Sequence, residues 1–161
     1  MGGTAGVRML DLQMDAVEEP VVVDTLTVRN LGTGAPAWVT VSLYEGTRLI
    51  AGPSSFTGGA VTWTGLAERV EPDAPEVWSV VYDFGVLAGG TYRVEVETGL
   101  AGGTGVYSSR SIAAAAGTVQ GAEVAAIPLP GDSGNKRCGL IGMELLLLAP
   151  FLLGRRRWTC R

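Results

Sequence analysis

Short runs of alternating apolar and polar residues, separated by turn-forming residues, recur along residues 7–127. The clearest run covers 91–98, where Tyr92, Val94 and Val96 alternate with three charged residues. Alternation with a period of two is typical of a strand that buries one face of a sheet. We find no amphipathic helical stripe with capping residues in this part of the sequence. The pattern therefore restricts residues 7–127 to a fold built from strands.

The alternating runs predict about seven or eight strands. They cover residues 7–14, 20–30, 38–44, 48–51, 60–64, 76–84 and 91–98, with one or two more in 105–114 and 118–127. Turns fall about every ten residues, which is the spacing of two-sheet β-proteins. We expect an all-β fold, an antiparallel immunoglobulin-like β-sandwich, with five aromatic residues in its core or at its edges: Trp38, Trp63, Trp78, Tyr82 and Phe84.

The composition changes after residue 127, and we expect three parts. Residues 1–127 form the sandwich domain, and residues 128–137 form a flexible linker rich in Pro, Gly and Ser. Residues 138–161 contain an apolar run and a basic cluster, which predict a short hydrophobic helix in a sorting or transmembrane segment. No basic region followed by an apolar run opens the sequence. We therefore interpret the chain as one whose start has been trimmed or wrongly assigned, or as the C-terminal piece of a longer precursor.

Charge is distributed unevenly between these parts. Residues 136–161 hold six basic residues and one acid, a net charge of +5, whereas residues 1–135 hold six Arg and fifteen acids, a net charge of −9. An acidic body does not suit a polyanion, so we expect no nucleic-acid partner. The basic cluster belongs to the C-terminal segment and has to be explained there.

The sequence lacks the residues that most enzyme mechanisms use. It contains no histidine, which removes the commonest general base and the commonest metal ligand. A Ser–Lys dyad would require the single lysine, Lys136, which lies in the linker. We therefore expect no catalytic residues, no cofactor and no metal, and a protein that is not an enzyme.

Several acids and glycines are candidates for calcium or phosphate binding. Glu18, Glu19, Glu71 and Asp73 do not form a calcium-binding loop pattern, and we interpret them as solvated loop acids. Asp83 is interpreted as an acid that caps a turn. The three glycines of the 102–105 stretch are interpreted as a turn, because no helix follows them to complete a phosphate-binding loop: Gly102, Gly103 and Gly105.

The apolar run at 138–154 has the properties of a short membrane segment. As a helix its 17 residues would extend about 25 Å, which is at the short end for a bilayer core. Arg155, Arg156 and Arg157 would keep its far end in the cytoplasm. Glu144 would lie near the outer interface, and Pro150 would kink the helix. We therefore expect a precursor in the inner membrane, with the body outside and the C-terminus in the cytoplasm.

The C-terminal segment resembles a known class of bacterial sorting signals. The stretch Cys138-Gly139-Leu140-Ile141-Gly142-Met143-Glu144, followed by leucines and the Arg155–Arg157 cluster, is similar to the JDVT-CTERM type. That type is related in logic to the PEP-CTERM and GlyGly-CTERM signals. The resemblance covers about the last 26 residues. Pro150 and the extension at 158–161 depart from the pattern, which affects the efficiency of recognition more than its type.

The resemblance implies that an intramembrane protease recognises and removes the segment. Cys138 and Gly139 would mark the processing region, and Gly142 and Glu144 would belong to the recognised motif. Cys138 would also offer an attachment point for a lipid or a glycan. An ordinary permanent membrane anchor, with Cys138 incidental, remains the alternative.

The body resembles adhesion modules more loosely. The stretches 26–34 and 39–49 are similar to CARDB-like modules of the immunoglobulin-like class, and 80–84 and 89–94 to a β-sandwich module of surface proteins. These resemblances imply an exported bacterial surface protein, structural or adhesive, displayed on the envelope or released after processing. Its expected partners are the membrane, the sorting protease and surface polysaccharides or proteins. The alternative is a carbohydrate-binding module at the C-terminus of a longer secreted enzyme.

Overall fold

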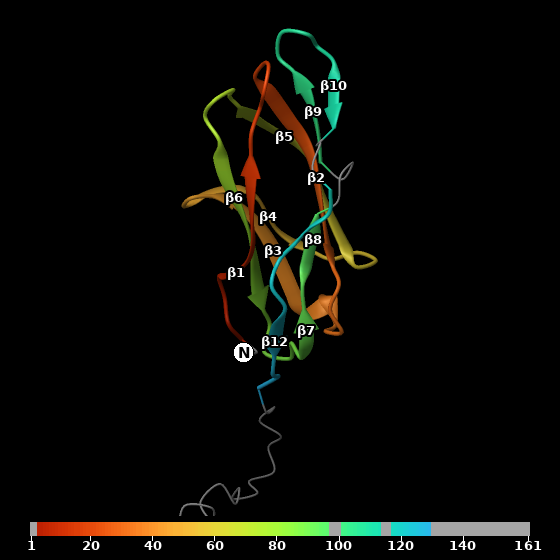
Figure 1. Cartoon of the computed structure of the whole chain (residues 1–161). Coiled ribbons are helices and arrows are strands. Elements are labelled where there is room, and N and C mark those ends of the chain that lie inside the picture. The colour runs from red at the N-terminus through yellow and green to blue at the C-terminus, as the bar shows by residue number, and fades with distance from the viewer. Residues whose placement is uncertain (1–2, 97–100, 114–116, 130–161) are drawn as a thin grey trace, which may run out of the picture. The chain divides into compact units, whose positions relative to one another are not determined.

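The computed structural model describes residues 3–96, 101–113 and 117–129. These residues belong to a compact unit that extends from Met1 to Leu129. The expectations for the C-terminal helix and for most of the linker concern residues 130–161, which lie outside the described residues. Within the described part the fold is all-β, and every pair of named strands is antiparallel (Figure 1).

Two large sheets and one small sheet make up the body. The first sheet has the order β1-β6-β3-β4, formed by Val7–Met14, Glu76–Phe84, Val39–Glu45 and Arg48–Ser55. The second has the order β10-β9-β2-β8-β11, formed by Ser111–Ala113, Ala101–Gly105, Val21–Asn30, Val94–Val96 and Val119–Gln120. In addition, β5 (Ala60–Val70) pairs with β2. The small sheet joins β12 (Val124–Ala126) to β7 (Gly90–Tyr92).

Strand β2 organises the second sheet because it has partners on both sides. Along one side it pairs with β5 from Val21 to Arg29. Along the other side it pairs first with β9 and then, at Arg29 and Asn30, with β8. The two short strands β9 and β8 therefore lie one after the other along the same side of β2. Between them they give β2 a hydrogen-bonded neighbour near both of its ends.

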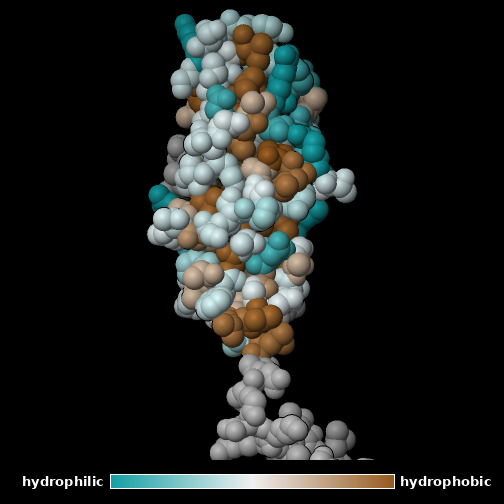
Figure 2. Space-filling model, turned by 180° about the vertical axis from the view of Figure 1, so that it is seen from behind, coloured by the Kyte–Doolittle hydropathy of each residue, from teal (hydrophilic) through white to brown (hydrophobic). Residues whose placement is uncertain are grey.

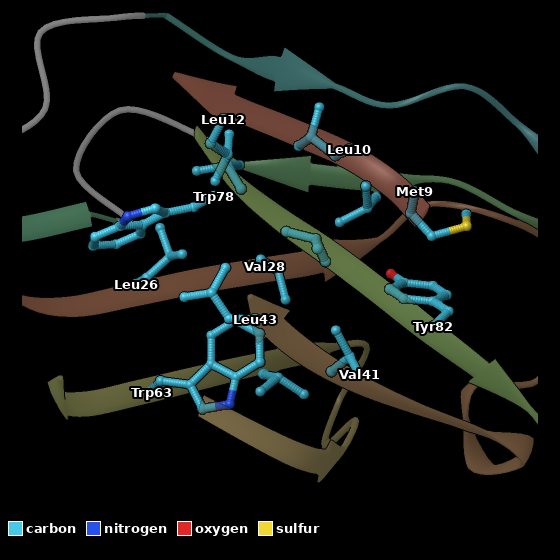
Figure 3. Close-up of a cluster of buried hydrophobic side chains, with 14 of the residues drawn as sticks. Met9, Leu10, Leu12, Leu26, Val28, Val41, Leu43, Trp63, Trp78 and Tyr82 are labelled. Carbon is cyan, nitrogen blue, oxygen red and sulfur yellow. The ribbon is translucent and has the colours of Figure 1, made fainter. Parts of the chain in front are cut away.

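One hydrophobic core is shared by the two large sheets (Figure 3). Alternate residues of β3 and β6 supply one side of it, and alternate residues of β2 and β8 supply the other. The largest fully buried side chains are Trp78, Tyr82, Tyr92, Leu26, Leu43, Val28, Val39, Val41, Val80 and Val94. Burying this much apolar surface supplies the main driving force of folding, and it fixes the register of each strand.

Several expected strands agree with the structure, and others differ in their ends. Strands β1 and β6 have the expected bounds of 7–14 and 76–84. The strand expected at 38–44 begins one residue later, because Trp38 closes a 3-10 turn, η1 (Pro36–Trp38). Pro36 favours that turn, since its fixed φ suits the first helical position. The expected strands at 48–51 and 60–64 continue into β4 and β5, which end at Ser55 and Val70.

The interpretation of the 102–105 glycines as a turn was wrong. Gly102, Gly103 and Gly105 lie in β9, beside β2. A β-carbon on Gly103 would lie 2.5 Å from the Val22 carbonyl oxygen, so this glycine permits a close backbone approach within the sheet. The sequence signal was ambiguous because glycine marks both turns and close approaches.

Candidate functional site

The residues predicted to direct sorting all lie outside the described residues. They are Cys138, Gly139, Gly142, Glu144, Arg155, Arg156 and Arg157. Their roles therefore remain predictions from the sequence. Among residues 3–96, 101–113 and 117–129, no helix combines the length and the apolar character needed to cross a membrane.

The described body contains a cleft of about 480 Å³, which the sequence did not predict. It opens between the connection from β1 to β2 and the strands β9 and β10. Its aliphatic lining includes Met14, Ala16, Val21, Val23, Val70 and Ile112. Three acids, Asp15, Glu18 and Glu19, belong to the same lining. Apolar contact beside carboxylates suits a ligand that has an aliphatic part and a positive charge.

Glu19 holds the β9–β10 connection against the rim of this cleft. Its carboxylate accepts hydrogen bonds from the backbone N–H groups of Tyr107 (2.7 Å) and Ser108 (2.9 Å). Hydrogen bonds from the side chain and backbone of Ser108, and from the backbone of Tyr107, lower the pKa of the Glu19 carboxyl. Glu19 is therefore a solvated loop acid with an additional role, because its carboxylate also holds two backbone N–H groups. Its neighbour Glu18, which was interpreted in the same way, is exposed to solvent.

We expect the substitution Glu19→Gln to loosen the β9–β10 connection. A neutral amide accepts weaker hydrogen bonds than a carboxylate, so the amide protection factors of Tyr107 and Ser108 should fall at neutral pH. Because the pKa of Glu19 is lowered in the folded protein, its contribution is present above the ordinary carboxyl pKa. That contribution is lost as the pH falls through the lowered value. Hydrogen exchange followed by NMR measures both effects.

The matched control for this prediction is Glu18→Gln, which removes a charge at the adjacent position. It should leave the protection factors of the two amides unchanged. Equal losses in the two variants would show that charge near the cleft matters, and not the hydrogen bonds from Glu19.

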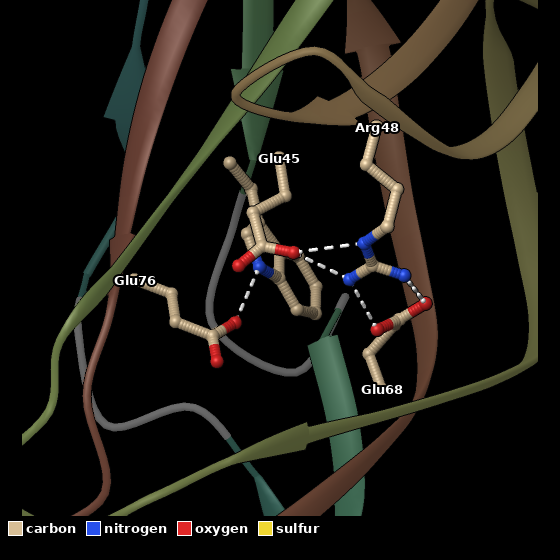
Figure 4. A network of polar contacts seen from close by, with 5 residues as sticks. Glu45, Arg48, Glu68 and Glu76 are labelled. Carbon is tan, nitrogen blue, oxygen red and sulfur yellow. Dashed lines mark hydrogen bonds and ion pairs between the residues drawn. The ribbon is translucent and has the colours of Figure 1, made fainter.

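A second polar cluster joins the two large sheets (Figure 4). Arg48 of β4 donates to Glu45 at the end of β3, at 3.0 and 2.5 Å, and to both carboxylate oxygens of Glu68 in β5, at 2.8 and 2.7 Å. The hydrogen bonds from Arg48 lower the pKa of the Glu68 carboxyl. The Arg48 side chain is 52% exposed, so solvent screening limits what the cluster adds to stability. It positions neighbouring strands and has the character of a structural cluster.

Two further acids singled out in the sequence, Asp83 and Glu71, have identifiable contacts. Asp83, in β6, accepts a hydrogen bond from the Gly6 N–H at 2.6 Å, so it holds the segment that leads into β1. Glu71 pairs with Arg69 at 2.5 Å. No group of three or more Asp, Glu or Cys side chains in the described part of the chain is arranged to hold a metal ion.

Comparisons with protein-family models, with curated proteins and with solved structures found no match to this chain. The class of this protein is defined by its own structure, which is an all-β body with two antiparallel sheets packed on one core. Arguments about function rest on the residues of this chain.

Proposed function

We propose that this chain is an exported bacterial surface protein, in which a β-sandwich of immunoglobulin-like type serves a structural or adhesive role. Its C-terminal segment would direct it to the membrane, where an intramembrane protease would cut it near Cys138. The mature body would then stay on the envelope or be released from it.

One observation carries this proposal, which is the order of features after the body. The last described strand, β12, ends at Ala126 and pairs with β7. The sequence then continues through the 128–137 linker, the apolar run at 138–154 and the three arginines that follow. This order is required of a membrane-directing segment that follows a domain translocated before it.

The cleft supports an adhesive role more than a role in binding carbohydrate. Its described lining is aliphatic and acidic, without an aromatic ring that could lie flat against a sugar. A basic side chain with an aliphatic stem, projecting from another surface protein, has the matching chemistry.

Intact mass spectrometry of the protein from the envelope and medium of its native host tests the proposal. The mature protein should end near Cys138, with or without an added group. The variant Cys138→Ala should accumulate as the longer form, because the expected processing residue is missing. Cys160→Ala is the matched control, since it changes a cysteine beyond the expected cut and should be processed normally.

Three results would overturn the proposal in different ways. A mass that extends through Arg161 in the unaltered protein would mean that the segment is a permanent anchor. Normal processing of Cys138→Ala would mean that the protease recognises other residues. Recovery of the protein from the cytoplasmic fraction alone would contradict export itself.

A further inference from the structure

One end of the body is built from segments without a single charged residue. They are residues 3–7, 31–43, 84–92 and 124–129, in a chain in which 17% of residues are charged. Far apart in sequence, these segments are brought together by the fold. Asp83 borders these segments and accepts a hydrogen bond from the Gly6 N–H, so the surface without charge ends there.

Backbone hydrogen bonds join the four segments to one another. Gly3 N–H donates to the Gly85 carbonyl at 3.0 Å, and Gly85 N–H donates to the Trp38 carbonyl at 2.7 Å. Leu129 N–H donates to the Val86 carbonyl at 2.9 Å. Strand β12 also pairs with β7, which lies within the 84–92 segment. The uncharged end is therefore one connected structure, and we call it the apolar tip.

The apolar tip exposes large hydrophobic side chains to solvent. Six of the ten large hydrophobic residues that are exposed in the described part lie in its segments: Leu31, Trp38, Val86, Leu87, Ile127 and Leu129. Among them Ile127 is 72% exposed and Val86 is 56% exposed. Figure 2 shows apolar surface gathered at the end of the body where Figure 1 places β7 and β12. An exposed apolar patch of this kind marks a surface that meets a partner.

Charged residues instead surround the cleft, which is built from other segments. Asp15, Glu18 and Glu19 belong to its lining, and Arg69 pairs with Glu71 one residue beyond Val70 of the same lining. The body therefore combines a charged region with a tip whose own segments carry no charged residue and which Asp83 borders. An acidic protein can approach an anionic lipid surface closely only through a part that carries no negative charge.

We propose that the apolar tip rests in the interfacial region of the lipid bilayer, an inference that depends on the proposed membrane segment at 138–154. Eight residues, 130–137, separate Leu129 from that segment, and a fully extended stretch of this length reaches at most about 29 Å. A bilayer would thus always be within reach of the tip. Trp38 and the aliphatic side chains suit the boundary between headgroups and acyl chains.

The chemistry of the tip favours a lipid partner over a second protein. A stable protein interface needs a complementary surface with a polar rim and hydrogen bonds as well as apolar contacts. The tip offers six exposed large hydrophobic side chains. Each apolar side chain that enters a lipid interface contributes separately, without a complementary protein surface.

A fluorescent probe on the full chain tests this inference. The chain would carry Leu87→Cys in a background of Cys138→Ser and Cys160→Ser, labelled with bimane, and would be reconstituted into vesicles that contain brominated phosphatidylcholine and phosphatidylglycerol. We expect bromine to quench the probe and its emission to shift to shorter wavelength. A probe at Val17→Cys, a site that is 88% exposed and lines the cleft, is the control and should show neither effect. Adding Val86→Asp should abolish the quenching at position 87.

Flotation of the same vesicles separates failure of this inference from failure of the proposed function. If the chain floats with the vesicles but the probe at position 87 is not quenched, the proposed contact of the tip with lipid is overturned. The proposed membrane segment would then still stand. Chain that does not float would overturn both. Crosslinking between Leu87→Cys chains, together with an unquenched probe, would assign the tip to a contact between copies. Quenching that persists in Val86→Asp would show that the linker alone holds the body near the lipid.

Discussion

Replacing Trp78 with alanine lowers the free energy of unfolding of the body by about 3–5 kcal/mol, which is the range for removal of a large buried aromatic side chain. Trp78 is the third residue of β6 and is fully buried. It lies between the two large sheets, and its indole N–H donates to Glu76 at 3.0 Å. Alanine would leave a cavity and an acceptor without its donor. Urea titration followed by far-UV circular dichroism measures the change.

Trp38→Ala is the matched control for this prediction. Trp38 is 46% exposed in solution, so its removal leaves no internal cavity. We expect it to change the free energy of unfolding by no more than about 0.5 kcal/mol. Similar losses in the two variants would contradict the central place of Trp78 in the core.

The substitution Gly32→Ala should destabilise the body by about 2–4 kcal/mol, because it forces two backbone segments apart and breaks hydrogen bonds between them. A β-carbon at this position would lie 1.8 Å from the carbonyl oxygen of Thr91. That oxygen also accepts a hydrogen bond from Gly34 N–H at 2.8 Å, and the Thr91 N–H donates to the Thr33 hydroxyl at 3.1 Å. Thermal and urea unfolding should both report the loss.

Gly102→Ala provides the corresponding control within the same body. A β-carbon on Gly102 would meet no atom within 4 Å, and the residue lies in strand β9. We expect a change within about 0.5 kcal/mol. A loss at Gly102 equal to the loss at Gly32 would point to a general intolerance of alanine at glycine positions, and not to the contact with Thr91.

The strands with regular alternation could be predicted because burial of one face dictates their pattern. Val39, Val41 and Leu43 were expected on one face of a strand, and all three are buried in β3. Position 9 shows the limit of this argument. A register shift between Arg8 and Leu10 interrupts the pairing of β1, and both Met9 and Leu10 are buried. Periodicity alone does not reveal such a bulge.

Glu95 shows a second limit of the sequence argument. Alternation assigned it to the solvent face of its strand, whereas only 6% of its surface is exposed. The side chain of Gln120, in β11, donates to it at 2.6 Å and satisfies the buried carboxylate. This partner lies 25 residues away, on the strand that pairs with β8 in the same sheet, so only the tertiary structure identifies it.

The candidate sites differ in how far the sequence could reveal them. The sorting residues were recognised as a contiguous motif, which needs no fold to be visible. The cleft is assembled from five strands and one connection, with Met14, Val70 and Ile112 brought together from distant positions. The apolar tip likewise depends on four separate segments that hydrogen bonds join. Such sites arise from topology, and the local pattern of residues does not encode them.

The cluster around Arg48 lies where another chain could add a strand to the sheets. An unpaired sheet edge is a template on which another chain can add a strand, and charged side chains are one means of preventing this. Strands β4 and β5 each end one side of a large sheet. Arg48 and Glu68 connect these two edges with paired charges. Another chain that approaches along this side meets paired charges, which oppose the addition of a strand to either edge.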